Sequence, residues 1–455
     1  MSRNGSKTLP FLIIAILTFA VYLNALQAGF LAVDDVDTIR HIQSGNVSIS
    51  GLFFTHGAEY FRPFAMLSLL MDYHLFGGNP AGYHLTNILI HLANSILVYL
   101  LALLVLGAGR NTSFYSFLAA LLFALHPVNS EAVVWISARP DLLCCSFFLL
   151  CLIILVKKGA EVTPLVFTGL FITFFCSLAS KEASLFLPAL AIVYCIKKRK
   201  TVPLKSTITA CVALFLAAGI YLWLRKGLPV AFPATANVPT RSEDTIFSFF
   251  LDGITAYGFY IGKLVYPFPL NIAITHISIL LSVIIFIAAV GLATLLWKRN
   301  SDFHFPVVFL YLSLVPPLGA LFLSTAWTPY AERYLYIPSV AFVLCAILFL
   351  RQYLDRLPRF LPIACIALLA LPTAYRVKMW TMPISFWQDA VAKSPDFGSL
   401  RLPLAAEYIE AKRFEEAEGA LRQANKLGLP RKSAKNFAHE LRVLLNEKKL
   451  ISHSP

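Results

Sequence analysis

The chain has 455 residues, of which 58% are hydrophobic and 14% are charged, and its mean hydropathy is +0.72. These values exclude an ordinary soluble protein and predict an all-α protein that crosses a membrane many times. The 38 basic and 24 acidic side chains give a net charge of +14. We attribute this charge to cytoplasmic loops and anionic lipid headgroups, and the absence of a soluble basic domain argues against nucleic acid as a partner.

Eleven apolar segments are candidate membrane spans, and the shorter ones are expected to lie inside the bundle. The first has no convincing small-x-small cleavage site, so we interpret it as a retained signal anchor. The segments are 10–29, 85–107, 113–127, 142–157, 163–180, 184–197, 206–224, 276–297, 304–323, 338–353 and 359–375.

Basic residues predict the orientation of these spans. They cluster at 157–158, 197–200, 298–299 and 351–359, each time on the side shared with the N-terminus. By the positive-inside rule this side is cytoplasmic. An odd number of spans then leaves the C-terminus on the outer side.

The remaining polar segments are expected on the outer face. The first outer loop, 30–84, is long, and the short loops 127–141, 180–184 and 324–338 are rich in charge. Within the interfacial segment 225–275, Ser242 is a candidate N-cap and apolar residues recur at helical spacing up to Leu264. We expect an amphipathic helix on the membrane surface there, rather than a twelfth span.

The chain changes character after residue 380, which predicts a membrane domain at 1–380 and a helical segment at 381–455. The latter resembles one tetratricopeptide unit closed by Pro430, although a generic helical hairpin remains the alternative. A single unit is unable to bury both its faces, so it should pack on the membrane domain or on a partner. The apolar positions are Ala405, Tyr408, Ala411, Phe414, Ala417, Leu421, Ala424 and Leu427.

Two adjacent acids, Asp34 and Asp35, follow the first span. Carboxylates beside a bilayer are costly unless they face water, a cation or a reacting group. A carboxylate of this kind can take the proton of an acceptor hydroxyl in glycosyl transfer. Helix capping, a salt bridge and Mg²⁺ or Mn²⁺ binding are the alternatives. Arg62 can pair with one of these acids or with a phosphate.

The loop HPVNSEAVVWISARPD places five functional side chains between two spans. Glu131 and Trp135 are one helical turn apart, so an acid and an aromatic ring share a face suited to a sugar. Arg139 and Asp141 follow directly. His126 is more often a hydrogen-bonded interface histidine than a ligand of a substrate.

Two further loops carry cations. Lys181 and Glu182 interrupt apolar sequence as an adjacent ion pair, either a snorkelling pair or a lysine that reaches a donor phosphate. Arg333 follows Glu332 among tyrosines, and a guanidinium there can hold a lipid phosphate.

Several nucleotide and protease motifs are absent: the P-loop, the Rossmann glycine pattern, G-x-S-x-G and H-E-x-x-H. ATP-driven transport and soluble nucleotide-sugar chemistry are therefore unsupported. An enzyme that works on the outer face would need a donor carried by a lipid.

Taken in order, six segments resemble the GT-C superfamily of membrane glycosyltransferases. The match is closest to the transmembrane and tetratricopeptide-repeat O-mannosyltransferases and their bacterial relatives. The segments are VDDVD, YFRPFAMLSLLMDYHLFGGNPAGYHLTNILIHLANSILVYLL, FALHPVNSEAVVWISARPDLL, SLASKEASLFLPAL, AERYLYIPS and the repeat-like tail.

The resemblance implies transfer of a sugar from a polyprenyl-phosphate-linked donor. It assigns Asp35 as the base with Asp34 as its partner, and Arg139, Lys181 and Arg333 as contacts of the donor phosphate. The short tail leaves protein, lipid and polysaccharide acceptors open, because a long repeat array would be the natural surface for a protein acceptor.

We therefore expect a glycosyltransferase of the bacterial inner membrane, with a cytoplasmic N-terminus and a periplasmic tail. Arg62 is a further expected contact of the donor, and whether a divalent cation assists is left open. The rival interpretation is a non-catalytic lipid flippase, transporter or scaffold. Sugar or acceptor contacts are expected from Glu131, Glu182, His126 and Asp141.

Overall fold

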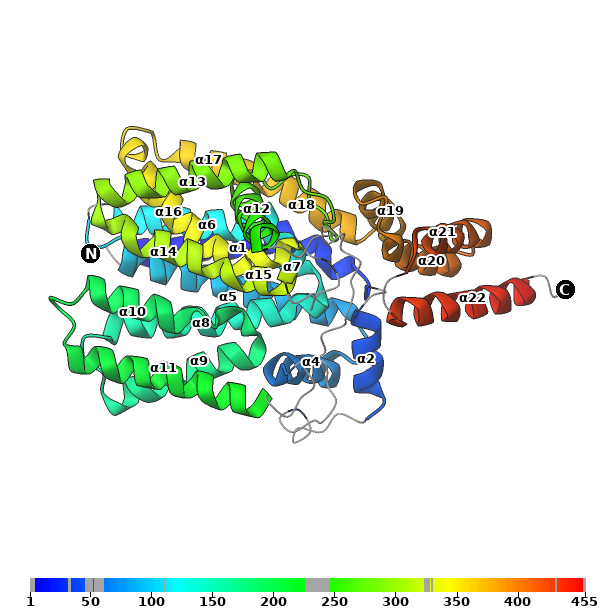
Figure 1. Ribbon diagram of the computed structural model, residues 1–455, viewed down its shortest axis with the longest axis horizontal. Helices are drawn as coiled ribbons and strands as arrows, with labels where there is room; N and C mark the ends of the chain where they lie inside the picture. The colour runs from blue at the N-terminus through cyan, green and yellow to red at the C-terminus, as the bar shows by residue number, and fades with distance from the viewer. Residues whose placement is uncertain are drawn as a thin grey trace.

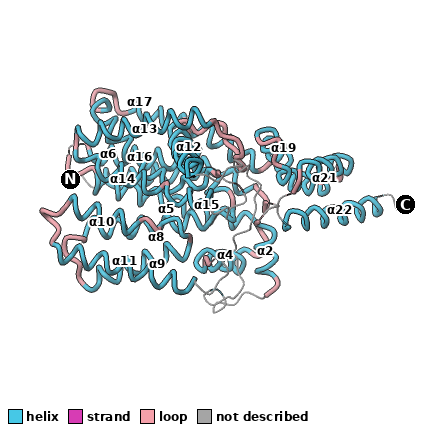
Figure 2. Tube along the Cα trace, viewed as in Figure 1, coloured by secondary structure: helices cyan, strands magenta, loops and turns pink. Residues whose placement is uncertain are grey.

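The computed structural model describes residues 5–31, 34–45, 52, 61–109, 111–225, 246–322, 328, 330–429 and 432–452. Within these ranges the regular elements are helices, with one isolated bridge between Ile274 and Tyr330 (Figure 2). The all-α prediction is therefore confirmed.

The α-helices of the membrane domain are α1 (Gly5–Tyr22), α2 (Asp35–Gln43), α4 (Pro63–Phe76), α5 (Pro80–Val105), α6 (Thr112–Leu125), α7 (Ser130–Val134), α8 (Arg139–Lys158), α9 (Pro164–Ser180), α10 (Leu187–Lys197), α11 (Leu204–Arg225), α12 (Ile246–Val265), α13 (Ile279–Arg299), α14 (His304–Ser313), α15 (Val315–Phe322), α16 (Tyr336–Leu354), α17 (Phe360–Leu368) and α18 (Ala370–Trp380). The tail contains α19 (Pro383–Lys393), α20 (Arg401–Glu410), α21 (Phe414–Leu427) and α22 (Lys432–Ser452).

Eight stretches of the described chain are helical, long and apolar enough to cross a membrane, and a bent pair raises this number to nine. All eleven expected segments are helical, but the count of eleven spans is not confirmed, because α6, α9 and α10 are too short by this criterion. The chain turns by 49° between α6 and α7, where Pro127 disfavours a helical conformation for the preceding residue. The protein is thus an integral, multi-pass membrane protein.

The long helices run along the longest axis of the molecule (Figure 1). The start of α1 and the connection between α10 and α11 lie at one end, whereas α2, α4 and the tail lie at the other. The cationic segment 197–200 is therefore far from the acids at the start of α2. This arrangement agrees with the separation expected from the positive-inside rule.

Helix α12 crosses the bundle direction and is seen end-on in Figure 1. It is the amphipathic helix expected near residues 242–264, although Ser242, Pro229, Pro233 and Pro239 lie outside the described residues. A Cβ on Gly258 would lie 1.8 Å from the carbonyl oxygen of Ser282, and one on Gly262 would lie 3.0 Å from Ile285. Glycine at these positions therefore lets α12 touch α13 at the backbone.

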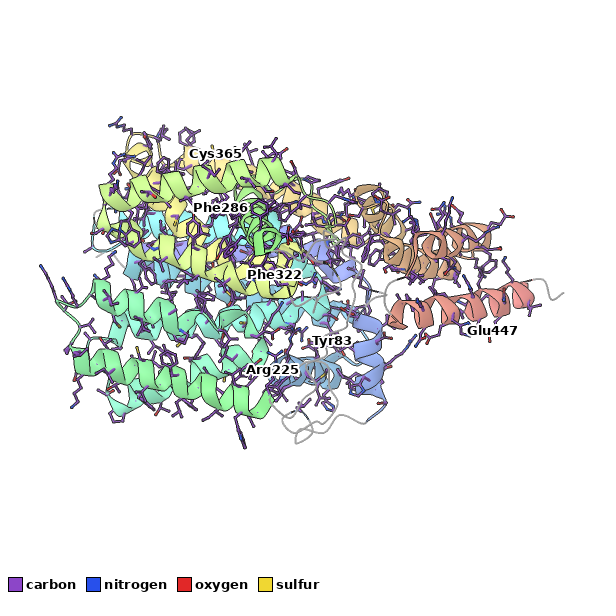
Figure 3. The ribbon with its side chains drawn as sticks, viewed as in Figure 1. Tyr83, Arg225, Phe286, Phe322, Cys365 and Glu447 are labelled. Carbon is purple, nitrogen blue, oxygen red and sulfur yellow. The ribbon has the colours of Figure 1, made fainter. Side chains whose placement is uncertain are left out.

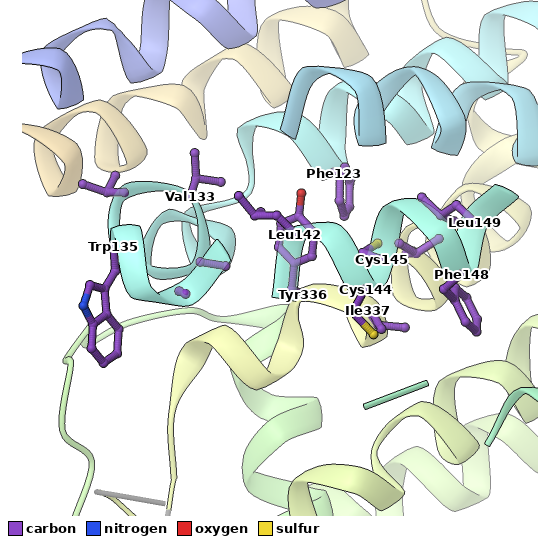
Figure 4. Packing of buried hydrophobic residues seen from close by; sticks show 14 of the residues in the cluster. Phe123, Val133, Trp135, Leu142, Cys144, Cys145, Phe148, Leu149, Tyr336 and Ile337 are labelled. Carbon is purple, nitrogen blue, oxygen red and sulfur yellow. The ribbon is translucent and has the colours of Figure 1, made fainter. Parts of the chain in front are cut away.

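A core of apolar side chains joins the central helices. The ring centroids of Phe123 on α6 and Tyr336 on α16 are 5.3 Å apart, and Leu142 of α8 lies beside them (Figure 4). All eight cysteines are free thiols, and Cys144 and Cys145 pack in this core.

The first tail helix, α19, packs on the membrane domain, where Lys393 and Ser394 hydrogen-bond to Leu270 and Ala273. Trp387 of α19 and Leu404 of α20 belong to the same core cluster as Val340 of α16. Of the eight expected apolar positions in the tail, Ala405, Tyr408, Ala417, Leu421 and Ala424 are buried. Contact of the tail with the membrane domain is therefore observed for α19. The repeat identity stays a prediction, and Pro430 lies outside the described residues.

Candidate functional site

The outer end of the bundle gathers the charged loops predicted from the sequence. The start of α2, the start of α4, the turns around α7 and α8, the 3-10 turn Glu182–Ser184 and the 3-10 turn Glu332–Leu335 all contribute. Figure 3 shows Tyr83 and Arg225 at the same end of the molecule as α2. Segments separated by up to 300 residues thus supply one site.

Asp35 is buried at the first position of α2. Its Oδ2 accepts a hydrogen bond from the backbone N–H of Leu31 at 3.0 Å, and its Oδ1 accepts bonds from the backbone N–H of Ser137 at 2.8 Å and from the Ser137 hydroxyl. Burial raises the pKa of Asp35 to about 6, and the Ser137 hydrogen bonds oppose that shift. Asp35 thereby ties the start of α2 to the 3-10 turn Ile136–Ala138.

Asp34 lies one residue earlier and is exposed to solvent. It is the N-cap residue of α2, but its side chain makes no capping bond. The two acids therefore differ in solvent exposure: Asp34 is exposed, whereas Asp35 is buried. Neither belongs to a group of three His, Cys, Asp or Glu side chains able to hold a metal, and no such group occurs in the described part of the chain.

Arg139 is fully buried and bound on several sides. Its Nη1 lies 2.6 Å from Asp72 Oδ2 and 3.1 Å from Ser68 Oγ. Its Nε donates to Asn87 Oδ1 at 2.7 Å, and its Nη2 donates to the carbonyl oxygen of Tyr83 at 2.8 Å. These five residues form a closed arginine cluster, so the geometry does not favour the expected contact between Arg139 and a donor phosphate.

Lys181 pairs with Asp141 instead of its neighbour Glu182. Its Nζ lies 2.6 Å from Oδ1 and 2.7 Å from Oδ2 of Asp141, and 5.3 Å from the centre of the Tyr334 ring. Burial lowers the pKa of Lys181, and Asp141 opposes this shift. The interpretation of Lys181 and Glu182 as a mutual ion pair is therefore wrong, because the extended backbone at Lys181 directs the two side chains to different partners.

Arg62 pairs with Glu182 across 3.2 Å, at an opening where the two side chains are 23% and 32% exposed. Burial raises the pKa of Glu182, but the nearby cations Arg62, Lys181 and Arg225, together with a backbone hydrogen bond, outweigh burial and lower the pKa to about 2. Glu182 is thus ionised at every working pH. The sequence analysis considered either one of the two acids, Asp34 and Asp35, or a phosphate as the partner of Arg62. The structure pairs Arg62 with Glu182 instead.

Arg333 lies between an acid and two aromatic rings. Its Nη1 is 2.5 Å from Glu131 Oε1, and its backbone N–H donates to Glu131 Oε2 at 3.1 Å. Its guanidinium lies 4.8 Å from the centre of the Trp135 ring and 5.0 Å from that of Tyr334. Glu131 and Trp135 do share a face, as predicted, but Arg333 occupies it.

We call Arg62, Glu182, Lys181, Asp141, Arg333 and Glu131 the outer cluster. The cations of the outer cluster lie close enough to repel one another, because Arg62 and Arg333 both lower the pKa of Lys181. Arg225 adds a further cation near Glu182. The outer cluster thus brings three cations together, with Arg225 nearby, and cations grouped in this way suit an anionic ligand.

His126 makes two structural hydrogen bonds. Its Nε2 lies 3.0 Å from the carbonyl oxygen of Leu264, and its Nδ1 accepts from the backbone N–H of Val128 at 3.3 Å. The ring thereby joins the break between α6 and α7 to the end of α12. This geometry matches an interface histidine better than the expected contact with a sugar or acceptor.

Several residues that complete the site escaped the sequence analysis. Asp72 is the partner of Arg139, and Ser137 binds Asp35. Lys263 of α12 lies 3.2 Å from Oε1 of Glu332. The one available signal was an isolated acid or base within an apolar helix, which Asp72 and Lys263 both show.

No family model matches the chain. It is 34% identical over 160 residues to human "Protein O-mannosyl-transferase TMTC2", an alignment that covers 32% of this chain and 18% of that protein. Over 412 residues it is 25% identical to "Protein O-mannosyl-transferase F38B6.6" of Caenorhabditis elegans, covering 84% of this chain and 58% of the relative. The predicted resemblance to O-mannosyltransferases is confirmed, and the chain spans less than two thirds of the length of these relatives.

Two solved structures show low overall similarity. ArnT of Cupriavidus metallidurans, bound to undecaprenyl phosphate, aligns with a TM-score of 0.42 at 14% identity, over 98% of this chain and 78% of that chain. The oligosaccharyltransferase of Archaeoglobus fulgidus aligns with a TM-score of 0.44 at 12% identity, over 86% and 58% of the two chains.

Proposed function

We propose that this protein is a membrane glycosyltransferase that takes a sugar from a polyprenyl-phosphate-linked donor. The observation that carries the proposal is the convergence of distant outer loops into one cationic cluster beside the Asp34–Asp35 turn. The curated relatives, whose names describe O-mannosyl transfer, support it. A flippase or scaffold has no corresponding need for an exposed acid at this place.

The donor phosphate would bind the cations of the outer cluster. Arg333 lies beside two aromatic rings, Arg62 is partly exposed, and Lys181 is close enough to interact electrostatically with both. Arginine binds phosphate bidentately, and these cations would stabilise the charge that develops on the leaving phosphate. Arg139 has no part in this step, because its donors are already used.

The reaction then balances as follows. The acceptor hydroxyl oxygen forms a bond to the anomeric carbon, and the bond from that carbon to the phosphate oxygen breaks. The electron pair leaves with the polyprenyl phosphate, and the hydroxyl proton passes to a carboxylate. The geometry favours Asp34 as this base, with Asp35 as the residue that positions it, which reverses the roles that the resemblance implied.

Catalysis would take place on the outer face, with the N-terminus in the cytoplasm. We further propose the bacterial inner membrane as the location and a protein, lipid or polysaccharide as the acceptor. Single-cysteine variants test the sidedness: Ser44→Cys of α2 and Thr201→Cys are both exposed and lie at opposite ends. An impermeant thiol reagent should label Ser44→Cys from outside and Thr201→Cys only after permeabilisation. Labelling of both from one side would overturn the topology.

The activity is tested with purified protein and several synthetic polyprenyl-phosphate sugars. Mass spectrometry should detect a sugar on a protein or lipid acceptor, and Asp34→Asn is the matched inactive control. Parallel reactions with a chelator determine whether Mg²⁺ or Mn²⁺ assists. Absence of transfer and of donor hydrolysis with every sugar would contradict the proposal.

A further inference from the structure

The first helix of the tail touches the loop that follows α12. We propose that Lys393 and Ser394, at the end of α19, are positioning residues for the donor site and act on Arg333 through residues 270–274. This inference rests on the proposed function. It gives the tail a role in holding the side chain of Arg333 in place, and this role does not require the tail to bind an acceptor.

The contact is made of buried hydrogen bonds. The Ser394 hydroxyl donates to the carbonyl oxygen of Ala273 at 2.7 Å and accepts from Asn271 Nδ2 at 3.0 Å. Lys393 Nζ donates to the carbonyl oxygen of Leu270 at 2.8 Å. Ser394, Asn271 and Ala273 are each at most 4% exposed. Loss of the Ser394 hydroxyl would remove one of the two hydrogen bonds that Asn271 Nδ2 donates and leave the Ala273 carbonyl oxygen with Asn271 as its side-chain donor.

The other side of the same loop holds the segment that carries Arg333. The backbone N–H of Asn271 donates to Oε1 of Glu332 at 3.0 Å, and Ile274 forms an antiparallel bridge with Tyr330. Glu332 therefore receives a hydrogen bond from the loop that the tail fixes. Lys263 binds the same carboxylate oxygen and completes this support.

Arg333 is the next residue in the chain, on the same 3-10 turn as Glu332. Its side chain turns away from the loop to Glu131, whereas that of Glu332 turns towards it. Movement of Glu332 therefore displaces the guanidinium of Arg333. A misplacement of about 1 Å at a reacting centre can lower a rate by about 10²-fold, so a small contact in the tail has a measurable effect.

The test uses the full-length protein with three variants: Ser394→Ala, Lys393→Met and the double variant that carries both changes. Lys448→Met serves as the control. Lys448 also makes a 2.8 Å bond, to Glu410, but within the tail alone. Hydrogen exchange of residues 330–335 should be at least about tenfold faster in the double variant and unchanged in Lys448→Met. Equal exchange in both variants would overturn the inference, whether or not transferase activity is found.

Kinetics then separate a positioning effect from a general loss of structure. We expect kcat/KM for the donor to fall about tenfold in Ser394→Ala and to recover in Ser394→Thr, which keeps the hydroxyl. In a background of Arg333→Lys, Ser394→Ala should have little further effect, because both changes act on one guanidinium. Full additivity would refute a route through Arg333. Inactivity of the wild type together with accelerated exchange would refute only the proposed function.

Discussion

The outer end of the molecule contains two groups of charged residues that look alike in the sequence and differ in the structure. In the closed arginine cluster, Arg139 is held by four neighbours and is fully buried. In the outer cluster, Arg333 pairs with Glu131, Lys181 with Asp141 and Arg62 with Glu182 among the described residues. Aromatic rings lie beside Arg333 and Lys181, and Arg62 is partly exposed to solvent.

This difference separates structure from binding. An arginine has five N–H donors, so one that has satisfied most of them with protein atoms has little left for a ligand. A cation with one acidic partner can exchange or share that partner with a phosphate. Burial alone therefore does not identify a binding cation. A binding cation is better identified by the number of its N–H donors that are not already bound to protein atoms.

The largest expected effect distinguishes the two acids of the first outer loop. Asp34→Asn should lower kcat by about 10²–10⁴-fold, the usual contribution of a general base, with a smaller effect on the melting temperature than Asp35→Asn, because Asp34 is exposed. Asp35→Asn should lower both, because its amide cannot accept all of the bonds from Leu31 and Ser137. A stable but inactive Asp35→Asn together with an active Asp34→Asn would restore Asp35 as the base.

The next effect is on stability. Arg139→Met leaves Asp72 buried without its partner and should lower the free energy of unfolding by about 3–5 kcal/mol. Arg62→Gln, whose partner is partly exposed, should change it by less than about 1 kcal/mol while raising the KM for the donor. Denaturation in detergent and donor titrations measure the two quantities. Similar stability of both variants would remove the distinction between the clusters.

The pH profile adds a test of Asp35. Its pKa of about 6 means that the residue becomes protonated as the pH falls from 7 to 5. Protonation weakens the hydrogen bonds that Asp35 accepts from Leu31 and Ser137 and so loosens its support of Asp34, and kcat/KM should therefore fall over this range. The raised pKa makes the folded state bind the proton more tightly than the unfolded chain. The contribution of Asp35 to stability therefore grows on acidification and is lost as the pH rises through 6. A parallel loss of activity and melting temperature between pH 7 and 5 would contradict this assignment.

The smallest effect concerns Glu182. Glu182→Gln removes a negative charge beside Arg62 and should tighten the binding of polyprenyl phosphate by about two- to fivefold, as expected for a partly exposed pair. Because its pKa is about 2, the gain should be constant from pH 5 to 8. Glu418→Gln, in a tail ion pair with Lys449, is the control. Weaker binding by Glu182→Gln would mean that the acid positions Arg62 for the ligand.

Much of the fold could be predicted from hydrophobicity, since every expected apolar segment is helical. Individual breaks were harder to predict. The span 304–323 divides into α14 and α15, and 359–375 into α17 and α18. Such breaks depend on packing between helices, which a hydropathy pattern does not contain. The lower span count has a different cause: both of these broken segments still count among the eight long apolar stretches, whereas α6, α9 and α10 are too short to do so.

The position of the site could also be predicted, because charges at the ends of apolar segments have to face water or one another. Their pairing could not. Arg139 has Asp141 two residues away but binds Asp72, and Lys181 has Glu182 beside it but binds Asp141. Pairing depends on where distant helices place their side chains. Likewise, the enclosure of Asp35 depends on Ser137, about a hundred residues further along the chain.

The backbone contact between α12 and α13 at Gly258 has a mechanical consequence. A helix that spans the membrane tilts when the thickness of the bilayer changes, and α13 is mostly surrounded by lipid because only 11% of its apolar stretch is buried in the protein. Because no side chain separates the two helices at Gly258, a tilt of α13 is expected to move α12 and, with it, Lys263. We therefore expect the acyl-chain length of the host lipid to change the distance between Lys263 and Glu332, and with it the turnover number of the neighbouring site.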